Sequence, residues 1–133
     1  MKSEPGIYSI DDLKRDGVTA WDGVRNYQAR NFMRDKMKKG DLVLFYHSNA
    51  EPSGTAGLAV VHREGYADPK DSVWSLVDVK FAEKFKNFVS LADLKADPAL
   101  KDMLVVRKGS RLSVQPVEER HFKIVCRMGG SRV

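Results

Sequence analysis

Residues 41–47 read Asp-Leu-Val-Leu-Phe-Tyr-His, and this run sets the interpretation of the rest of the chain. Leu42 to Tyr46 are all apolar or aromatic, so neither face of a strand built from them would be polar. Strands of that composition are buried on both faces. The run therefore predicts a central strand of a sheet, and Gly40-Asp41 predicts the turn that leads into it.

Helical segments are expected both before and after this strand in the sequence. Ser9 is a suitable N-cap for a short helix over Asp11–Arg15, and Gly17 is suited to end it. Residues 19–26 have no clear period and are interpreted as a loop. The other expected helical segments are Tyr27–Lys38 with Ala29, Met33 and Met37 toward the core, Leu91–Ala96 after the N-cap Ser90, a turn over Asp97–Met103, and a last helix opened by Pro116.

Three further strands are expected, over Ala56–His62, Trp74–Phe81 and Arg111–Gln115. Helices and strands of mixed order indicate an α+β fold in which strands curl around a small core. The pattern by itself does not choose between a small β-barrel and an open α+β sheet.

The composition fits a single domain over residues 1–133, with 42% hydrophobic residues spread along the chain. The formal net charge of +5 is compatible with a polyanionic partner. No signal peptide or apolar run of membrane-spanning length is apparent, so we expect a soluble protein of the cytoplasm, or of the nucleus in a eukaryote, without membrane contact. The oligomeric state is open, with a monomer favoured.

Neither a metal nor a cofactor is expected. The single cysteine, Cys126, allows no intramolecular disulfide, and its spacing from His121 does not match that of metal ligands. Motifs of the GxSxG, P-loop and HExxH types are missing from the sequence.

Several strings, in their order along the chain, resemble the EVE domain, a branch of the PUA-like superfamily. The strings are Lys2-Ser3-Glu4-Pro5 with Tyr8-Ser9, residues 21–32 (WDGVRNYQARNF), Lys39-Gly40-Asp41 with residues 45–49 (FYHSN), Val77-Asp78-Val79 with Phe81, Val89-Ser90-Leu91, and residues 111–117 (RLSVQPV).

The resemblance implies a PUA-like pseudo-barrel whose pocket takes in a base flipped out of a nucleic-acid helix. Related folds read modified cytosines in DNA or modified bases in RNA. The expected partner is therefore a nucleic acid that contains modified bases. This chain departs from the family in one respect: its segment 66–73 is shorter, which would reduce any strand contacts made there.

A flipped-base pocket needs an aromatic or apolar face for stacking and hydrogen-bonding groups for the base edge. Trp21, in a polar glycine-containing segment, is interpreted as the stacking platform, and the alternative is a core tryptophan. Trp74 is interpreted as core. The resemblance implies that the other pocket residues are Ser3, Glu4, Val24, Arg25, Asn26, Tyr46, His47, Ser48, Ser113 and Gln115.

Several of these residues also have a purely structural interpretation. Asn26 could stabilise a turn, and Ser3 and Glu4 could belong to a frayed terminus. His47 could be a half-buried histidine with its hydrogen bonds satisfied. Phosphate contacts are expected from Lys2 and from a helical stripe of Arg30, Arg34 and Lys38, which would otherwise be a solvated charged face.

The function indicated is a non-catalytic reader module. The main alternative is a hydrolase that acts on a modified nucleoside, with Lys2, Glu4 and His47 as base, acid and orienting group. A third interpretation is a protein-binding adaptor that uses the basic face.

Overall fold

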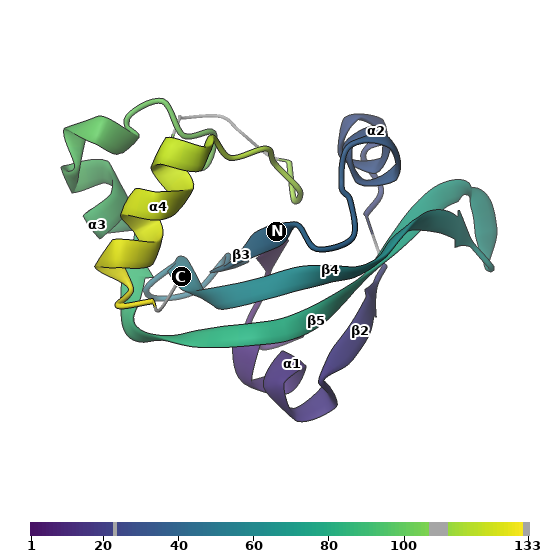
Figure 1. The fold of residues 1–133 in the computed structure, drawn as a ribbon, viewed down its shortest axis with the longest axis horizontal. Helices are drawn as coiled ribbons and strands as arrows, with labels where there is room; N and C mark the ends of the chain where they lie inside the picture. The colour runs from purple at the N-terminus through teal and green to yellow at the C-terminus, as the bar shows by residue number, and fades with distance from the viewer. Residues whose placement is uncertain (23, 107–111, 132–133) are drawn as a thin grey trace.

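The computed structural model describes residues 1–22, 24–106 and 112–131, which form one mixed sheet of five strands with the order β1-β3-β4-β5-β2 (Figure 1). β1 is parallel to β3, and the other pairs are antiparallel. The strands are β1 (Lys2–Ser3), β2 (Val18–Trp21), β3 (Leu42–His47), β4 (Gly54–Asp68) and β5 (Asp71–Ser90).

Helices lie at both ends of the sheet. Figure 1 shows α3 and α4 together at one end, while α2 lies near the other end, beside the projecting hairpin of β4 and β5. The helical elements are α1 (Ile10–Asp16), α2 (Tyr27–Asp35), α3 (Leu91–Ala96), the 3-10 helix η1 (Pro98–Leu100) and α4 (Glu119–Met128). Within the described ranges, no helix is long and apolar enough to cross a membrane.

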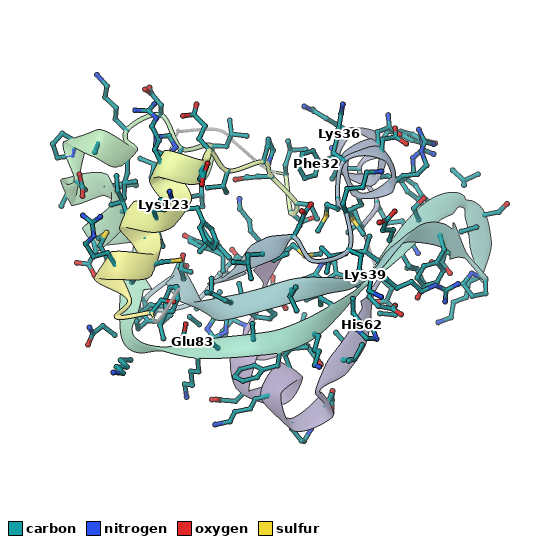
Figure 2. All side chains as sticks on the ribbon, viewed as in Figure 1. Phe32, Lys36, Lys39, His62, Glu83 and Lys123 are labelled. Atoms are coloured by element: carbon teal, nitrogen blue, oxygen red, sulfur yellow. The ribbon has the colours of Figure 1, made fainter. Side chains whose placement is uncertain are left out.

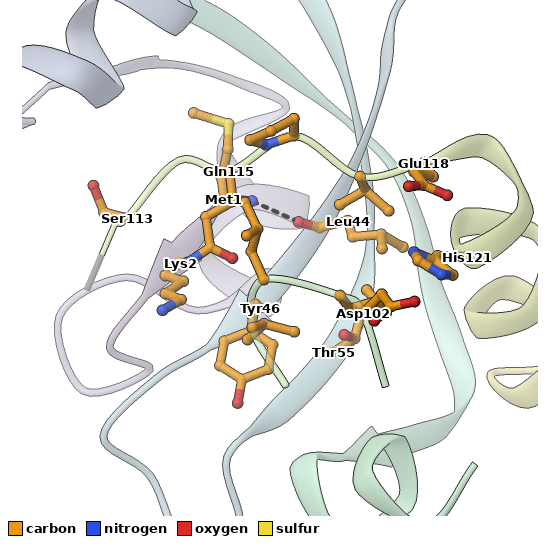
Figure 3. Close-up of a pocket in the computed structure, with 15 residues that line it drawn as sticks. Met1, Lys2, Leu44, Tyr46, Thr55, Asp102, Ser113, Gln115, Glu118 and His121 are labelled. Atoms are coloured by element: carbon orange, nitrogen blue, oxygen red, sulfur yellow. Dashed lines mark hydrogen bonds between the residues drawn. The ribbon is translucent and has the colours of Figure 1, made fainter. Parts of the chain in front are cut away.

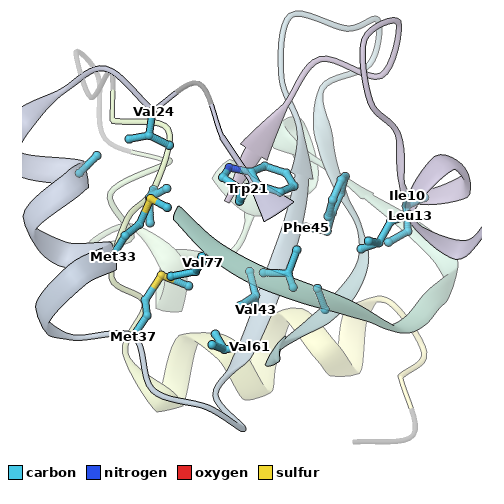
Figure 4. Packing of buried hydrophobic residues seen from close by; sticks show 14 of the residues in the cluster. Ile10, Leu13, Trp21, Val24, Met33, Met37, Val43, Phe45, Val61 and Val77 are labelled. Atoms are coloured by element: carbon cyan, nitrogen blue, oxygen red, sulfur yellow. The ribbon is translucent and has the colours of Figure 1, made fainter. Parts of the chain in front are cut away.

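β3 is buried on both faces, as its composition predicts. Val43 and Phe45 belong to a core that also contains residues of α1 and α2, here named the α1/α2 core (Figure 4). Leu44 and Tyr46 belong to a second core with residues of α3, η1 and α4. Successive side chains of a strand point to opposite faces, so one short run supplies both cores.

The helix ends confirm the expected caps. Ser9 accepts a hydrogen bond from the amide of Asp12, whose carboxylate accepts one from the amide of Ser9. Ser90 and Asp93 form the same reciprocal pair at α3. Gly17 ends α1 with a φ of 79°, a left-handed conformation that favours glycine.

The prediction of a loop over residues 19–26 was wrong at its start, because Val18–Trp21 forms β2. Among the described residues β2 is an edge strand that pairs with β5 alone, and Val18 and Ala20 are exposed, so it carries no clear apolar period. β4 and β5 are also longer than predicted and take segment 66–73 into their hairpin. The residues of β4 and β5 near the hairpin turn are largely exposed, so the apolar pattern ends before the backbone pairing does.

The strand predicted over 111–115 was also wrong for Leu112–Gln115, which has no regular structure, and Arg111 lies outside the described residues. This segment meets β1 through the amide of Lys2, which donates to the carbonyl of Ser113 (2.8 Å). Two helix boundaries differ as well. α2 ends at Asp35, which leaves Lys38 beyond the helix, and α4 begins at Glu119, three residues after Pro116.

The sheet does not close into a barrel within the described part of the chain. β1 and β2 are its two edges, and no backbone pairing joins them among these residues. Residues of both edges nevertheless line one hollow, because the sheet curls and brings its edges toward each other. The α+β class is confirmed, and the expected pseudo-barrel has the form of an open, curled sheet.

Close approach of α2 to β4 depends on Gly65. A Cβ atom at this position would lie 2.8 Å from the Cα of Arg34 and 3.3 Å from the carbonyl oxygens of Met33 and Arg34. These are backbone atoms, so the helix itself would have to move. We expect Gly65→Ala to lower the free energy of unfolding by about 1–3 kcal/mol in chemical denaturation.

Gly6→Ala is the matched control, since a Cβ there meets nothing within 4 Å. Equal stability of both variants would contradict the close approach of α2 and β4.

Candidate nucleic-acid interface

The hollow between the two sheet edges, here named the edge pocket, has a volume of about 290 Å³. Pockets for small ligands span roughly 300–1,000 Å³, so this one is at the lower limit and suits one flat ring system. The lining residues come from β1, the turn before α1, β2 with the segment after it, and the segment near Gln115: Lys2, Ser3, Ile7, Tyr8, Thr19, Ala20, Trp21, Asp22, Val24 and Ser113.

Trp21 forms a fixed wall of the edge pocket. Its side chain is 8% exposed and belongs to the α1/α2 core (Figure 4). Phe45 contacts it edge to face at a centroid distance of 5.5 Å, and Tyr8 does so at 6.5 Å. Trp21 is therefore a core tryptophan that also lines the pocket, so its ring is held in place before any ligand arrives.

The turn between β1 and α1 is held by hydrogen bonds. The hydroxyl of Ser3 donates to the carbonyl of Tyr8 (2.6 Å), and the hydroxyl of Tyr8 donates to the carboxylate of Asp16 (2.8 Å). The carbonyl of Glu4 accepts from the amides of Ile7 (2.9 Å) and Tyr8 (2.8 Å). Ser3 and Glu4 thus belong to ordered structure and not to a frayed terminus.

The polar groups of the edge pocket suit the edge of a nucleobase. Asp22 supplies an exposed carboxylate, and Thr19 and Ser113 supply hydroxyls. Lys2 adds an ammonium group whose pKa is lowered because burial disfavours its charge. Together these groups can donate and accept hydrogen bonds around a ring that stacks on an aromatic wall.

Five of the predicted residues meet in the edge pocket, and the others lie elsewhere. Lys2, Ser3, Trp21, Val24 and Ser113 line it. The carboxylate of Glu4 instead accepts from the side-chain amide of Asn49 (2.7 Å). The side chain of Asn26 caps α2 by accepting from the amides of Gln28 (2.9 Å) and Ala29 (3.1 Å), which is the structural role.

Four further pocket candidates lie at the end of β3 or near Pro116. Nε2 of His47 accepts from the amide of Ile10 (3.1 Å), and Ser48 donates its amide to the carbonyl of Ser3. Tyr46 and Gln115 line a different hollow of about 530 Å³, shown in Figure 3.

That larger hollow faces the second core and is mainly apolar. Its lining comes from β1, β3, β4, the segment after η1, residues 113–117 and the start of α4 with His121, and Lys2 and Ser113 line it as well as the edge pocket (Figure 3). His121 is 2% exposed, and its Nε2 has no hydrogen-bond partner among the described residues. Another hollow of about 560 Å³ lies between α2, β3 and Pro116. Neither contains a tryptophan, so the edge pocket fits a stacked base better despite its smaller volume.

The interpretation of Trp74 as core was wrong. Its ring is half-buried and stacks on Tyr27 with centroids 5.0 Å apart and an angle of 24° between the planes. The guanidinium of Arg25 lies 5.2 Å from the Trp74 ring and 3.7 Å from the buried carboxylate of Asp68. Trp74 lies near the tip of the β4–β5 hairpin, so it stacks against α2 and does not enter the sheet core.

The predicted phosphate stripe is only partly present. Arg30 and Arg34 lie on α2, while Lys38 follows the helix. Arg30 donates to the carbonyl of Val73 (2.6 Å), and Arg34 is paired with Asp35 (2.8 Å). Figure 2 shows other basic residues well separated, with Lys36 beside α2 and Lys123 on α4. The positive charge is therefore spread over the surface.

Sequence reasoning missed Ile7, Tyr8, Thr19, Ala20 and Asp22 as pocket residues. The short apolar or hydroxyl-bearing side chains of β2 carry no motif, and its strand was not recognised. Tyr8 and Asp22 were part of the family strings, beside Ser9 and Trp21, and this was the available signal for them.

A curled mixed sheet with a pocket between its unpaired edges is the architecture of a PUA-like fold. The sequence profile of the EVE domain matches residues 1–128. Human thymocyte nuclear protein 1 is 39% identical over 160 aligned residues, covering 94% of this chain and 70% of that protein. The chain belongs to the EVE domain family.

Solved structures agree with this assignment. A protein from Agrobacterium tumefaciens superposes with a TM-score of 0.91 at 44% identity, covering 98% of this chain and 90% of that one. The human THYN1 protein in complex with DNA that contains 5-methylcytosine superposes with a TM-score of 0.85 at 38% identity, covering 100% and 97%.

His47 makes the stability of the fold depend on pH. Burial lowers its pKa from the ordinary value of 6.5, Asp11 opposes that shift, and Lys84 adds to it. Below the unfolded pKa the unfolded chain then binds more protons than the folded one, so stability decreases as the pH falls. Protonation also removes the lone pair that accepts from Ile10.

We expect the free energy of unfolding of the wild type to fall between about pH 7 and pH 5.5, and His47→Gln to show a smaller change. Denaturant titrations of both proteins at the two pH values measure the difference. Identical pH dependence in the two proteins would contradict this role of His47.

Proposed function

We propose that this chain is a reader module that holds a modified, flipped-out nucleobase in the edge pocket. The observation that carries the proposal is the convergence of a fixed tryptophan wall with hydrogen-bonding groups at the gap between β1 and β2. The complex of the related human THYN1 protein with DNA containing 5-methylcytosine supports a modified cytosine in DNA as the first ligand to test.

The pocket lining matches the chemistry of a modified cytosine. A ring stacked on Trp21 gains dispersion energy without further ordering of that side chain. The carboxylate of Asp22 can accept from the exocyclic amine of cytosine. Ala20 and Val24 offer apolar contact to a 5-methyl group, and the hydroxyl of Ser113 can hydrogen-bond the carbonyl or ring nitrogen, while that of Thr19 interacts with Tyr8.

The proposed role is binding without catalysis. The hydrolase alternative requires Glu4 and His47 as acid and orienting group, but Glu4 is engaged by Asn49 and Nε2 of His47 by the amide of Ile10. Cys126 is buried, and burial raises the pKa of its thiol, which disfavours a nucleophilic thiolate.

Phosphate contacts are proposed for Lys2, Arg25 and the basic residues of α2 and the segment after it. Lys2 lines it, and Arg25 follows Val24 directly in sequence. Arg30 shares the aromatic stack with Arg25, since its guanidinium lies 5.0 Å from the Tyr27 ring centroid. Arg34 and Lys38 extend this basic segment along and beyond α2. Such contacts position a strand and carry no sequence information.

Filling the edge pocket should abolish recognition of the modified base. We expect Ala20→Phe to remove the preference for a modified duplex, because the new ring occupies the place of the base. The measurement is a titration at fixed salt of labelled duplexes with cytosine, 5-methylcytosine or 5-hydroxymethylcytosine at one position. The wild type should bind at least one modified duplex more tightly than the unmodified one.

Val18→Phe is the matched control, because Val18 is exposed in the same strand and on the same face but does not line the pocket. It should retain the preference. Trp21→Ala is less informative, since truncating a buried tryptophan costs about 3–5 kcal/mol of stability. Equal binding of all three duplexes by the wild type would exclude these cytosine modifications in DNA, and modified RNA would be tested next. A change in nucleoside mass would favour the hydrolase.

A further inference from the structure

Ile7 is the most exposed large hydrophobic residue among those described, with 77% of its surface accessible. It also lines the edge pocket. It belongs to neither hydrophobic core, whereas Tyr27, the next most exposed at 60%, stacks on Trp74. Because it lines the edge pocket and packs into neither core, Ile7 is placed to contact whatever the pocket binds.

The backbone that carries Ile7 is held firmly. Its amide and that of Tyr8 both donate to the carbonyl of Glu4, at 2.9 and 2.8 Å. The side chain of Glu4 is in turn held by Asn49, and the carbonyl of Tyr8 accepts from Ser3. The turn therefore displays Ile7 at a fixed place beside the pocket and does not leave it on a loose loop.

A duplex that loses one base to a pocket is left with a gap in its base stack. Proteins that distort DNA commonly insert an apolar side chain between base steps. Such a side chain has to lie next to the pocket mouth, because the gap lies directly above the extruded base. Ile7 meets this requirement, and it is also large and uncharged.

We propose that Ile7 is a wedge that enters the base stack of duplex DNA at the gap left by the flipped base. The inference rests on the proposed function and deepens it, since it assigns the partner as a duplex and gives a residue outside the pocket floor a share in extruding the base. Insertion removes the isoleucine side chain from water and fills the gap between the flanking base pairs.

The test compares a duplex with the single strand that contains the same modified base, bound by wild type, Ile7→Ala and Ile7→Met. A single strand has no intact stack to fill. We expect Ile7→Ala to bind the duplex roughly tenfold more weakly and the single strand with unchanged affinity. Ile7→Met, which is apolar and long, should retain duplex binding.

The matched control is Leu42→Ala, which removes another exposed apolar side chain (43% accessible) that does not line the edge pocket. It should bind both nucleic acids as the wild type does. A 2-aminopurine next to the modified base reports on stacking directly. Its fluorescence should rise when wild type binds the duplex and rise less with Ile7→Ala.

The outcomes separate the two proposals. If wild type prefers the modified duplex but Ile7→Ala binds it equally well, the wedge is wrong and the reader function stands. If Ile7→Ala loses the same factor on duplex and single strand, Ile7 contacts the base itself and the wedge is also wrong. If wild type shows no preference and no fluorescence change, both proposals fail.

Discussion

The fold depends on the burial of β3 from both sides. A strand that is apolar on both faces leaves hydrocarbon in water unless a layer of protein covers each face. Here α1 and α2 contribute to one core, and α3, η1 and α4 contribute to the other. β4 shares this arrangement, with Ala59 and Val61 on one side and Leu58 on the other. The outer strands then curl around the cores that β3 and β4 help to form.

Curling brings the sheet edges close without joining them. Edge strands carry unpaired backbone groups, and full closure of a barrel would satisfy them. In this chain β1 has two residues and β2 has four, so neither edge offers a long ladder. The edge pocket lies between these two short edges. On the proposed function, the gap between the sheet edges is therefore also the binding site.

Rigidity around the edge pocket comes from residues that also hold the fold. Trp21 and Tyr8 pack on one another, and Ser3 fixes the turn that leads to α1. A preformed site loses little conformational entropy when it binds its ligand. The basic residues, in contrast, are spread out and partly engaged with Asp35, Asp68 and backbone carbonyls. On the proposed function, recognition would therefore depend more on the pocket than on a general attraction for phosphates.

The sequence by itself determined the elements whose signals are local. The apolar run of β3, the serine caps of α1 and α3 and the buried face of α2 are each set by residues within a few positions of one another. The family strings also predicted Ser3, Trp21, Val24 and Ser113 as pocket residues, and these four line the edge pocket. Local hydrogen bonds and side-chain periods have the same form whatever surrounds them.

Only the tertiary structure decided which residues meet at the gap between the sheet edges. β2 pairs with β5 at the edge of the sheet and is partly exposed, so its side chains need not follow an apolar period. Thr19 and Ala20 therefore gave no signal of a strand. Asn26 and His47 had polar side chains that suited a pocket, yet nearby backbone amides had already engaged them. Trp74 was apolar within a strand, but that strand continues past the core to a hairpin at the surface. For β2, His47 and Trp74 the outcome depends on partners distant in sequence, which composition and spacing do not encode. Asn26 is different, because it caps α2 through the neighbouring amides of Gln28 and Ala29, a local role that the sequence analysis had left open.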